Sequence, residues 1–111
     1  MPEITEEFIR SQVAGAKPYI VVLLKRGPNF ESTQHVHMEH LKHIFALRQS
    51  GEQVITLPVT ANGGDLCGIS VFVGADAAHV EELAAADPAV TTGRFVYELV
   101  NVMGIPGDGI A

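Results

Sequence analysis

Four histidines fall within nine residues of one segment, and imidazole is the side chain that most readily exchanges a proton near neutral pH. They are His35, His37, His40 and His43. On a helical wheel at about 100° per residue, Leu41 lies at the centre of the apolar arc, with His37 and His40 inside it and His43 just outside. His40 is therefore our candidate for a general base.

A histidine on the sheet-facing side of a helix has two ring nitrogens to satisfy. Asp65 is the carboxylate best placed in the chain order to hold one nitrogen of His40 and to leave the other for proton transfer. The alternative is structural: His40 is a half-buried, hydrogen-bonded residue, and Asp65 forms a turn after Gly63 and Gly64. The residue pattern leaves both interpretations open.

A metal site is another interpretation of the same segment, because His40 and His43 are three residues apart and Glu39 and His43 are four apart. The wheel, however, separates His40 from His35 and Glu39. No three ligands converge within the helix, so we predict that the protein holds no metal.

Tyr19, His37 and Arg94 are expected to contact a substrate. Arg94 precedes the last expected strand and could bind an anionic group bidentately, although a surface ion pair with Asp87 is the simpler interpretation. Tyr19 could present its hydroxyl to a pocket or be a core residue with a polar tip. Cys67 is expected to be a small core residue rather than a nucleophile.

Composition excludes several classes of protein. The 111 residues are 47% hydrophobic, which suits one folded domain with a real core. Seven Lys plus Arg against a net charge of −6 cannot supply a multi-phosphate footprint, so we expect no nucleic acid as partner. Gly63 and Gly64 open a strand rather than a helix, and no nucleotide cofactor is expected.

The location of the protein is expected to be the cytoplasm. The longest apolar run, Tyr19–Leu24, is far shorter than a bilayer span, and the first residues lack the basic start and apolar stretch of a signal peptide. The single cysteine, Cys67, forbids an internal disulfide and suits a reducing compartment. We expect no membrane partner.

Hydrophobic periodicity and turn residues predict the elements that position these side chains. We expect helices over 5–14, 33–50 and from Asp76 to Asp87-Pro88, and strands over 19–25, 53–57, 67–73 and 95–100. Ser32 or Thr33 is the expected cap of the main helix, and Gly51 its stop. Residues 17–103 form the domain, with an N-terminal helical extension over 1–16 and a tail over 104–111.

The β-α-β-β-α-β order of the domain predicts an α+β, ferredoxin-like fold, with two helices on one face of a four-stranded antiparallel sheet. Apolar residues fall on both faces of the strands at 19–24 and 68–73. The face without helices must then be covered too, most simply by the same face of a second copy. We therefore predict a homodimer.

Four short motifs, in this order, resemble the YCII-related family over residues 18–102. They are Tyr19-Ile-Val-Val-Leu-Leu-Lys-Arg-Gly-Pro-Asn29, His40-Leu-Lys-His43, Gly63-Gly-Asp-Leu-Cys-Gly-Ile69, and Ala84-Ala-Ala-Asp-Pro-Ala-Val90 with Gly93-Arg94 and Tyr97-Glu-Leu99. The resemblance implies a dimeric α+β barrel and an active site at His40 and Asp65. It also implies a cofactor-free lyase or isomerase, because one member of the family is a dehydrochlorinase of a chlorinated hydroxyquinol. A non-catalytic, dimeric small-molecule-binding module is the alternative function.

Overall fold

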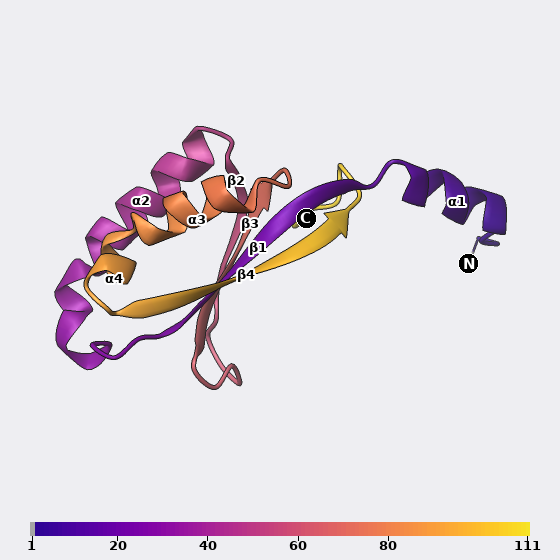
Figure 1. The fold of residues 1–111 in the computed structure, drawn as a ribbon. Helices are drawn as coiled ribbons and strands as arrows, with labels where there is room; N and C mark the ends of the chain where they lie inside the picture. The colour runs from indigo at the N-terminus through magenta and orange to yellow at the C-terminus, as the bar shows by residue number, and fades with distance from the viewer. Residues whose placement is uncertain (1) are drawn as a thin grey trace.

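The computed structural model describes residues 2–111 as a four-stranded sheet with helices on one side and one helix standing apart (Figure 1). The elements are α1 (Glu6–Ala14), β1 (Lys17–Arg26), the 3₁₀ helix η1 (Glu31–Val36), α2 (His37–Gln49), β2 (Gln53–Pro58), β3 (Leu66–Val73), α3 (Ala77–Ala85), α4 (Pro88–Thr91) and β4 (Phe95–Gly104). After α1, the arrangement confirms the predicted α+β, ferredoxin-like class.

The sheet has the order β2-β3-β1-β4, with β1 in the middle and every neighbouring pair antiparallel. Val22 lies opposite Ser70, while Val21 lies opposite Val71 and Val100. Residues directly opposite one another share a face, so alternate residues of β1 define the two faces of the whole sheet.

The core lies between the sheet and the helices. Ile20, Val22 and Leu24 of β1 are buried and alternate with half-buried neighbours, as expected of a strand that is apolar on both faces. Each such buried aliphatic side chain stabilises the fold by about 1.5–3 kcal/mol. The other buried apolar residues of this cluster are Leu47, Phe72, Val80, Ala84, Ala89 and Phe95.

The main helix begins later than predicted, because the chain first forms η1. Thr33 has non-helical dihedral angles (φ −120°, ψ 22°), and its hydroxyl donates to the carbonyl oxygen of Asn29 at 2.6 Å. The expected cap at Ser32 or Thr33 is therefore wrong. The expected stop is confirmed, because Gly51 adopts a φ of +83°, which favours glycine.

The buried face of α2 also differs from the wheel. Its buried residues are His40, Ile44 and Leu47, so the arc is centred on them rather than on Leu41. His37, expected inside the arc, is exposed, and Phe45 is 59% exposed. A wheel uses residue type alone and cannot tell which apolar residues a helix leaves in water, as α2 does with Phe45.

The helix predicted to stop at Asp87-Pro88 does end before this pair, and a second, short helix that was not predicted follows it. α3 ends at Ala85, and Pro88 is the first residue of α4, with Asp87 as its N-cap. Proline suits a first helical position because its missing N–H would have no helical acceptor there. Asp76 caps α3 as expected, accepting from the N–H of His79 at 3.1 Å.

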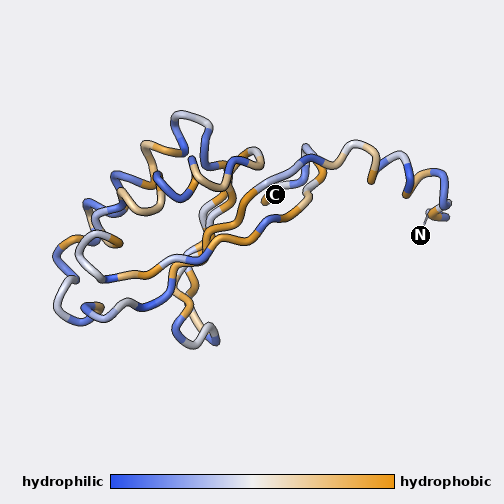
Figure 2. Tube along the Cα trace, in the orientation of Figure 1, coloured by the Kyte–Doolittle hydropathy of each residue, from blue (hydrophilic) through white to orange (hydrophobic). Residues whose placement is uncertain are grey.

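The other face of the sheet carries no helix in residues 2–111, and we call it the open face (Figure 1). By the strand register, its apolar side chains are Tyr19, Val21, Leu23, Ile55, Leu57, Ile69, Val71, Val73, Val96, Val100 and Val102. Figure 2 shows hydrophobic colour along much of these strands. Lys25 and Glu98, which also lie on this face, form an ion pair at 3.1 Å.

No helix within residues 2–111 is both long and apolar enough to cross a membrane.

Candidate functional site

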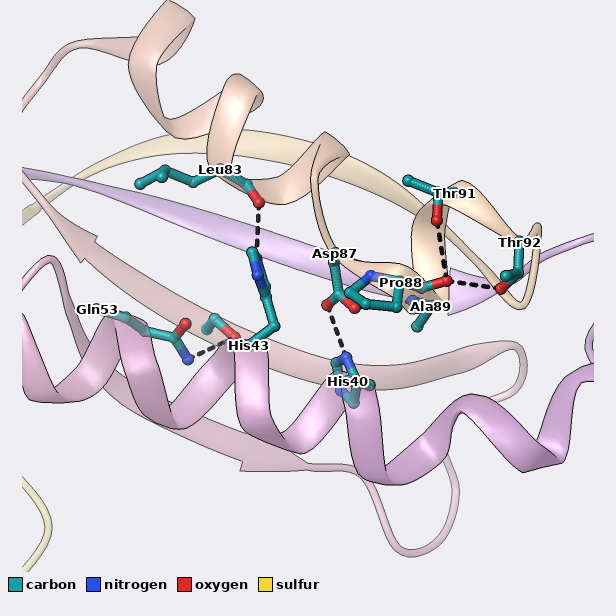
Figure 3. A network of polar contacts seen from close by, with 10 residues as sticks. His40, His43, Gln53, Leu83, Asp87, Pro88, Ala89, Thr91 and Thr92 are labelled. Carbon is teal, nitrogen blue, oxygen red and sulfur yellow. Dashed lines mark hydrogen bonds and ion pairs between the residues drawn. The ribbon is translucent and has the colours of Figure 1, made fainter.

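His40 and Asp87 form a buried pair between α2 and the start of α4 (Figure 3). The Nδ1 atom of His40 lies 2.6 Å from Oδ2 of Asp87. The side chains are 11% and 3% exposed, respectively. A short contact of this kind between imidazole and carboxylate is a charge-assisted hydrogen bond, which is about twice as strong as a neutral one.

Asp87 is held in place by its role as a helix cap. Its second carboxylate oxygen, Oδ1, accepts from the N–H of Ala89 at 2.8 Å, and its carbonyl oxygen accepts from the N–H groups of Val90 and Thr91. Pro88 fixes the backbone at the first helical position. Both carboxylate oxygens thus have defined partners, and the carboxylate cannot rotate freely.

This pairing determines which nitrogen of His40 is free. An ionised carboxylate can only accept, so Nδ1 carries the proton and donates it to Asp87. In the neutral ring, Nε2 then bears a lone pair. Within residues 2–111, the Nε2 atom of His40 has no hydrogen-bond partner. It is not fully buried, unlike the Oε1 atom of Gln53 and the Nε atom of Arg94. The free nitrogen of His40 therefore keeps some contact with solvent, although the side chain is largely buried.

The His40 ring lies next to a group of aromatic and cationic side chains. Its ring meets the Phe95 ring edge-on, with centroids 5.4 Å apart. The guanidinium carbon of Arg94 lies 5.4 Å from the centroid of Phe95 and 4.5 Å from that of Phe30. Arg26 lies over Phe30 as well, at 5.1 Å. Phe95 thus connects the histidine with a pair of arginines.

Arg94 is also fixed by a hydrogen bond from Nη1 to the carbonyl oxygen of Phe30 at 2.8 Å. The predicted ion pair between Arg94 and Asp87 does not form, because Asp87 is committed to His40. Residues 26–32, which include Arg26, Phe30 and Glu31, border an open hollow of about 260 Å³. An anionic group bound beside Arg26 and Phe30 would meet positive charge and an aromatic face.

The structure corrects the carboxylate that we expected beside His40. Asp65 lies exposed in the loop between β2 and β3, where its carbonyl oxygen accepts from the N–H of Arg26 at 2.9 Å and from the thiol of Cys67 at 3.4 Å. It is not brought to His40. The chain order suggested Asp65. The junction between α3 and α4 instead places Asp87 beside His40.

The remaining predicted site residues are dispersed. His37 is exposed, with its ring centroid 6.2 Å from that of His40. The Nε2–H group of His43 donates to the carbonyl oxygen of Leu83 at 2.9 Å, so this histidine joins α2 to α3. Tyr19 lies on the open face, opposite Val73 and therefore away from the helices.

The interior between the helices and the sheet is filled. The space bordered by residues such as Leu24, Ile44 and Phe72 amounts to about 10 Å³, at most enough for one water molecule. This space is therefore too small for a substrate.

No three His, Cys, Asp or Glu side chains within residues 2–111 are grouped as metal ligands. Cys67 is half-buried and packs against the core. Its thiol contacts a backbone carbonyl rather than a base.

Sequence reasoning missed Asp87, although the chain carries a signal for it. Aspartate followed by proline is typical of an N-cap and first helical residue, yet we read the pair only as the end of the preceding helix. An N-cap carboxylate is also a fixed acceptor, which is what a histidine base needs as partner.

Comparison of the chain with models of known protein families gives no match, and comparison with curated proteins gives none either. The resemblance to the YCII-related family therefore stays a prediction.

Proposed function

We propose that this protein is a cofactor-free lyase or isomerase in which His40 is the general base and Asp87 positions it. The observation that supports this most strongly is the free, accessible Nε2 atom of a histidine whose Nδ1 atom is held by a buried carboxylate. Asp87 takes the role that we expected of Asp65. A base held in one tautomer and orientation contributes about 10²–10⁴-fold to a rate.

The proposed step begins when Nε2 of His40 removes a proton from a carbon of the substrate. The C–H bond breaks, an N–H bond forms, and the imidazolium is stabilised by the Asp87 carboxylate. In a lyase, the electron pair left on carbon forms a double bond and expels a leaving group such as halide. In an isomerase, His40 returns the proton to another atom of the substrate.

The proposed substrate is a small cyclic or aromatic molecule with an anionic group. Arg26 and Arg94 flank Phe30 beside the dyad, so one end of such a molecule would pair with guanidinium and the ring would stack. This agrees with what the family resemblance implies, since the chlorinated hydroxyquinol of its one dehydrochlorinase is a ring that loses halide. His37, on the exposed side of His40, would border the same approach.

Proton exchange tests this function without requiring the natural substrate. Chlorinated hydroxyquinol and halogenated or hydroxylated aromatic acids would be incubated with the protein in D₂O, and deuterium uptake and halide release measured. We expect exchange with the natural sequence, none with His40→Gln, and about 10²-fold less with Asp87→Asn. Asp65→Asn is the matched control and should behave as the natural sequence.

The alternative is a non-catalytic module that binds a small molecule in the hollow bordered by residues 26–32. The filled interior beneath His40 favours it, because the histidine is then a packing residue with one satisfied nitrogen. A ligand that raises the melting temperature equally in the natural protein and in His40→Gln, with no exchange in either, would establish the module and contradict the enzyme.

The proposal includes a homodimer formed through the open face. Val73, Val96 and Val100 on this face are 43–54% exposed, and an apolar face of this extent on a sheet is normally covered. A second copy is the proposed cover, because identical apolar faces are self-complementary under two-fold symmetry.

A further inference from the structure

Helix α1 carries an apolar stripe that is not buried against the rest of residues 2–111. None of its residues is buried, and it projects from the end of β1, away from the body of the fold (Figure 1). Figure 2 shows hydrophobic and hydrophilic stretches alternating along it. The apolar side chains of this segment are Ile4 (58% exposed), Phe8 (51%), Ile9 (49%) and Val13 (61%).

A helix of this length needs a packing surface. α1 has nine residues, and isolated helices shorter than about 12–15 residues are marginal in water. Its local support is the Thr5 cap, which accepts from the N–H of Phe8 at 3.1 Å, and an exposed ion pair between Glu6 and Arg10 at 3.6 Å. Such an exposed pair adds only about 0.2–0.5 kcal/mol. The overall shape agrees: the radius of gyration is 16.3 Å, against about 13 Å for a compact chain of this size.

The open face offers an apolar hollow of about 510 Å³, which we call the tail hollow. Its sheet side is formed by Tyr19, Ile55, Val71, Val73 and Val102, and its remaining border by the C-terminal segment 104–110 and by Arg48 of α2. The tail hollow is continuous with the open face, because Val71, Val73 and Val102 belong to both.

We propose that α1 is an exchanged arm, whose Phe8, Ile9 and Val13 fill the tail hollow of a second copy of this chain. This proposal rests on the dimer proposed above and adds to it the element that completes the interface. Under two-fold symmetry each copy gives one arm and receives one, so the assembly closes at two.

The link to β1 favours a second copy over the chain's own hollow. Only Gly15 and Ala16 separate α1 from β1, and their N–H groups bond to the carbonyl oxygens of Gln12 and Val13 at 3.2 and 3.0 Å. These bonds hold the last turn of α1 where it points off the end of the sheet. Folding back onto the same chain would require breaking them.

Interface area is a second argument. Four strands about 4.8 Å apart, each contributing roughly seven residues at about 3.3 Å, present a face of roughly 450 Å². Two such faces together bury about 900 Å², which is less than the about 1,200–2,000 Å² that specific interfaces bury. Two reciprocal arms would bring the dimer into that range.

The tail hollow offers one cationic partner for the arm. The first turn of α1 carries Glu6 and Glu7, and the charged residues that border the hollow within residues 2–111 are Arg48 and Asp108. An acidic first turn beside Arg48 is favourable, whereas contact between two unrelated surfaces of a chain with net charge −6 would on average be repulsive.

Disulfide trapping between two different chains tests the arm directly. In a Cys67→Ser background, a tagged Ile9→Cys chain is mixed with an untagged Val54→Cys chain, since Val54 borders the tail hollow and is 40% exposed. We expect a heterodimeric disulfide under mild oxidation. Ser11→Cys, on the polar side of α1, is the matched control and should cross-link at least about tenfold more slowly.

Equal rates for Ile9→Cys and Ser11→Cys, or no cross-link from either, would overturn the proposal. One chain carrying both Ile9→Cys and Val54→Cys should give a disulfide-linked dimer. An internal disulfide in a single chain would instead mean that α1 folds onto its own hollow, which also overturns exchange.

Two substitutions separate the arm from the sheet-face dimer. Phe8→Asn should weaken dimerisation at least about tenfold, whereas Ser11→Asn should leave the dimer affinity unchanged. If Phe8→Asn leaves the dimer affinity unchanged and Val100→Asp dissociates the dimer, the exchanged arm is contradicted and the sheet interface is supported. If Val100→Asp still forms the dimer and still allows the disulfide between Ile9→Cys and Val54→Cys, the exchanged arm is supported and the sheet interface is contradicted.

Discussion

His40 Nδ1 donates to Oδ2 of Asp87 across 2.6 Å, and the two residues are 47 positions apart in the sequence. The contact joins α2 to the first turn of α4, so the pair links two helices that share no backbone hydrogen bond. The same contact therefore contributes to the stability of the fold, and in the proposed function it also positions His40 for proton transfer.

The charge of Asp87 should matter for stability as well as for chemistry. Asp87→Asn keeps an N-cap side chain but removes the carboxylate, and hydrogen bonds to charged groups are worth about 1.5–3 kcal/mol. We expect the free energy of unfolding to fall by that amount, as measured by urea denaturation. Asp65→Asn, at an exposed carboxylate, should change it by less than about 0.5 kcal/mol.

The tautomer of His40 gives an independent measurement of the same contact. Long-range ¹⁵N–¹H correlation spectra distinguish a protonated Nδ1 from a protonated Nε2. We expect His40 to carry its proton on Nδ1 when neutral, and Asp87→Asn to mix the two tautomers, because an amide can present either an acceptor or a donor. A neutral His40 with its proton on Nε2 in the natural protein would contradict the proposed base.

Stability should depend on pH through His79. Its hydrogen bond to Glu52, at 2.6 Å, raises the pKa of His79 above the ordinary 6.5, and the charges of Glu52, Asp76 and Glu82 act in the same direction while partial desolvation opposes them. A raised pKa means that the folded state favours the protonated ring. The stabilisation is therefore complete below about pH 6.5 and is lost as the pH rises through the folded-state pKa.

Glu52→Gln isolates this effect. The difference in unfolding free energy between the natural protein and Glu52→Gln should be largest near pH 5.5–6 and should shrink toward about pH 8.5. The pair is exposed, so the difference should be small and should decrease further in high salt. A difference that does not change with pH would show that the pair adds no linked stability.

Much of the fold could be predicted because its signals are local. The apolar run of β1, the alternation in β3 and the turn at Gly51 each reflect a backbone preference or a periodicity of their own segment. The order of those elements then leaves few topologies. The boundary of α2 was harder, because Thr33 bonds back to Asn29, an interaction that competes with a regular helix start.

The candidate site was only half predictable. The wheel selected His40 correctly for burial, although it also placed His37 inside the apolar arc when that side chain is exposed. The partner of His40 depends on how α3 and α4 pack against α2, and a contact of this kind leaves no periodic trace in the sequence. Asp87 could have been proposed only from its Asp-Pro context, as a cap whose carboxylate is fixed.

A buried polar contact beneath α2 should prove replaceable as a pair. Gln53 is 1% exposed, its Nε2 donates to Oγ of Ser70 at 3.2 Å, and its Oε1 is buried without a partner. Gln53→Met with Ser70→Ala should change the free energy of unfolding by less than about 1 kcal/mol. Gln53→Met alone leaves the Ser70 hydroxyl unpaired and should lower the free energy of unfolding by about 1–3 kcal/mol. Urea denaturation measures both changes.

The dimer through the open face is tested by a charge at its centre. Val100 lies opposite Val21 in the middle of this face and is 43% exposed, so Val100→Asp should leave the monomer folded. Two carboxylates brought together in an apolar interface are repulsive and poorly solvated, so we expect the dimer to weaken by several kcal/mol. Sedimentation at micromolar concentration should then give a monomer.

Phe45→Asp, which replaces an exposed apolar residue on the outer side of α2, is the matched control and should remain dimeric. A monomer for the natural sequence, or equal loss of the dimer in both variants, would contradict an interface through the sheet.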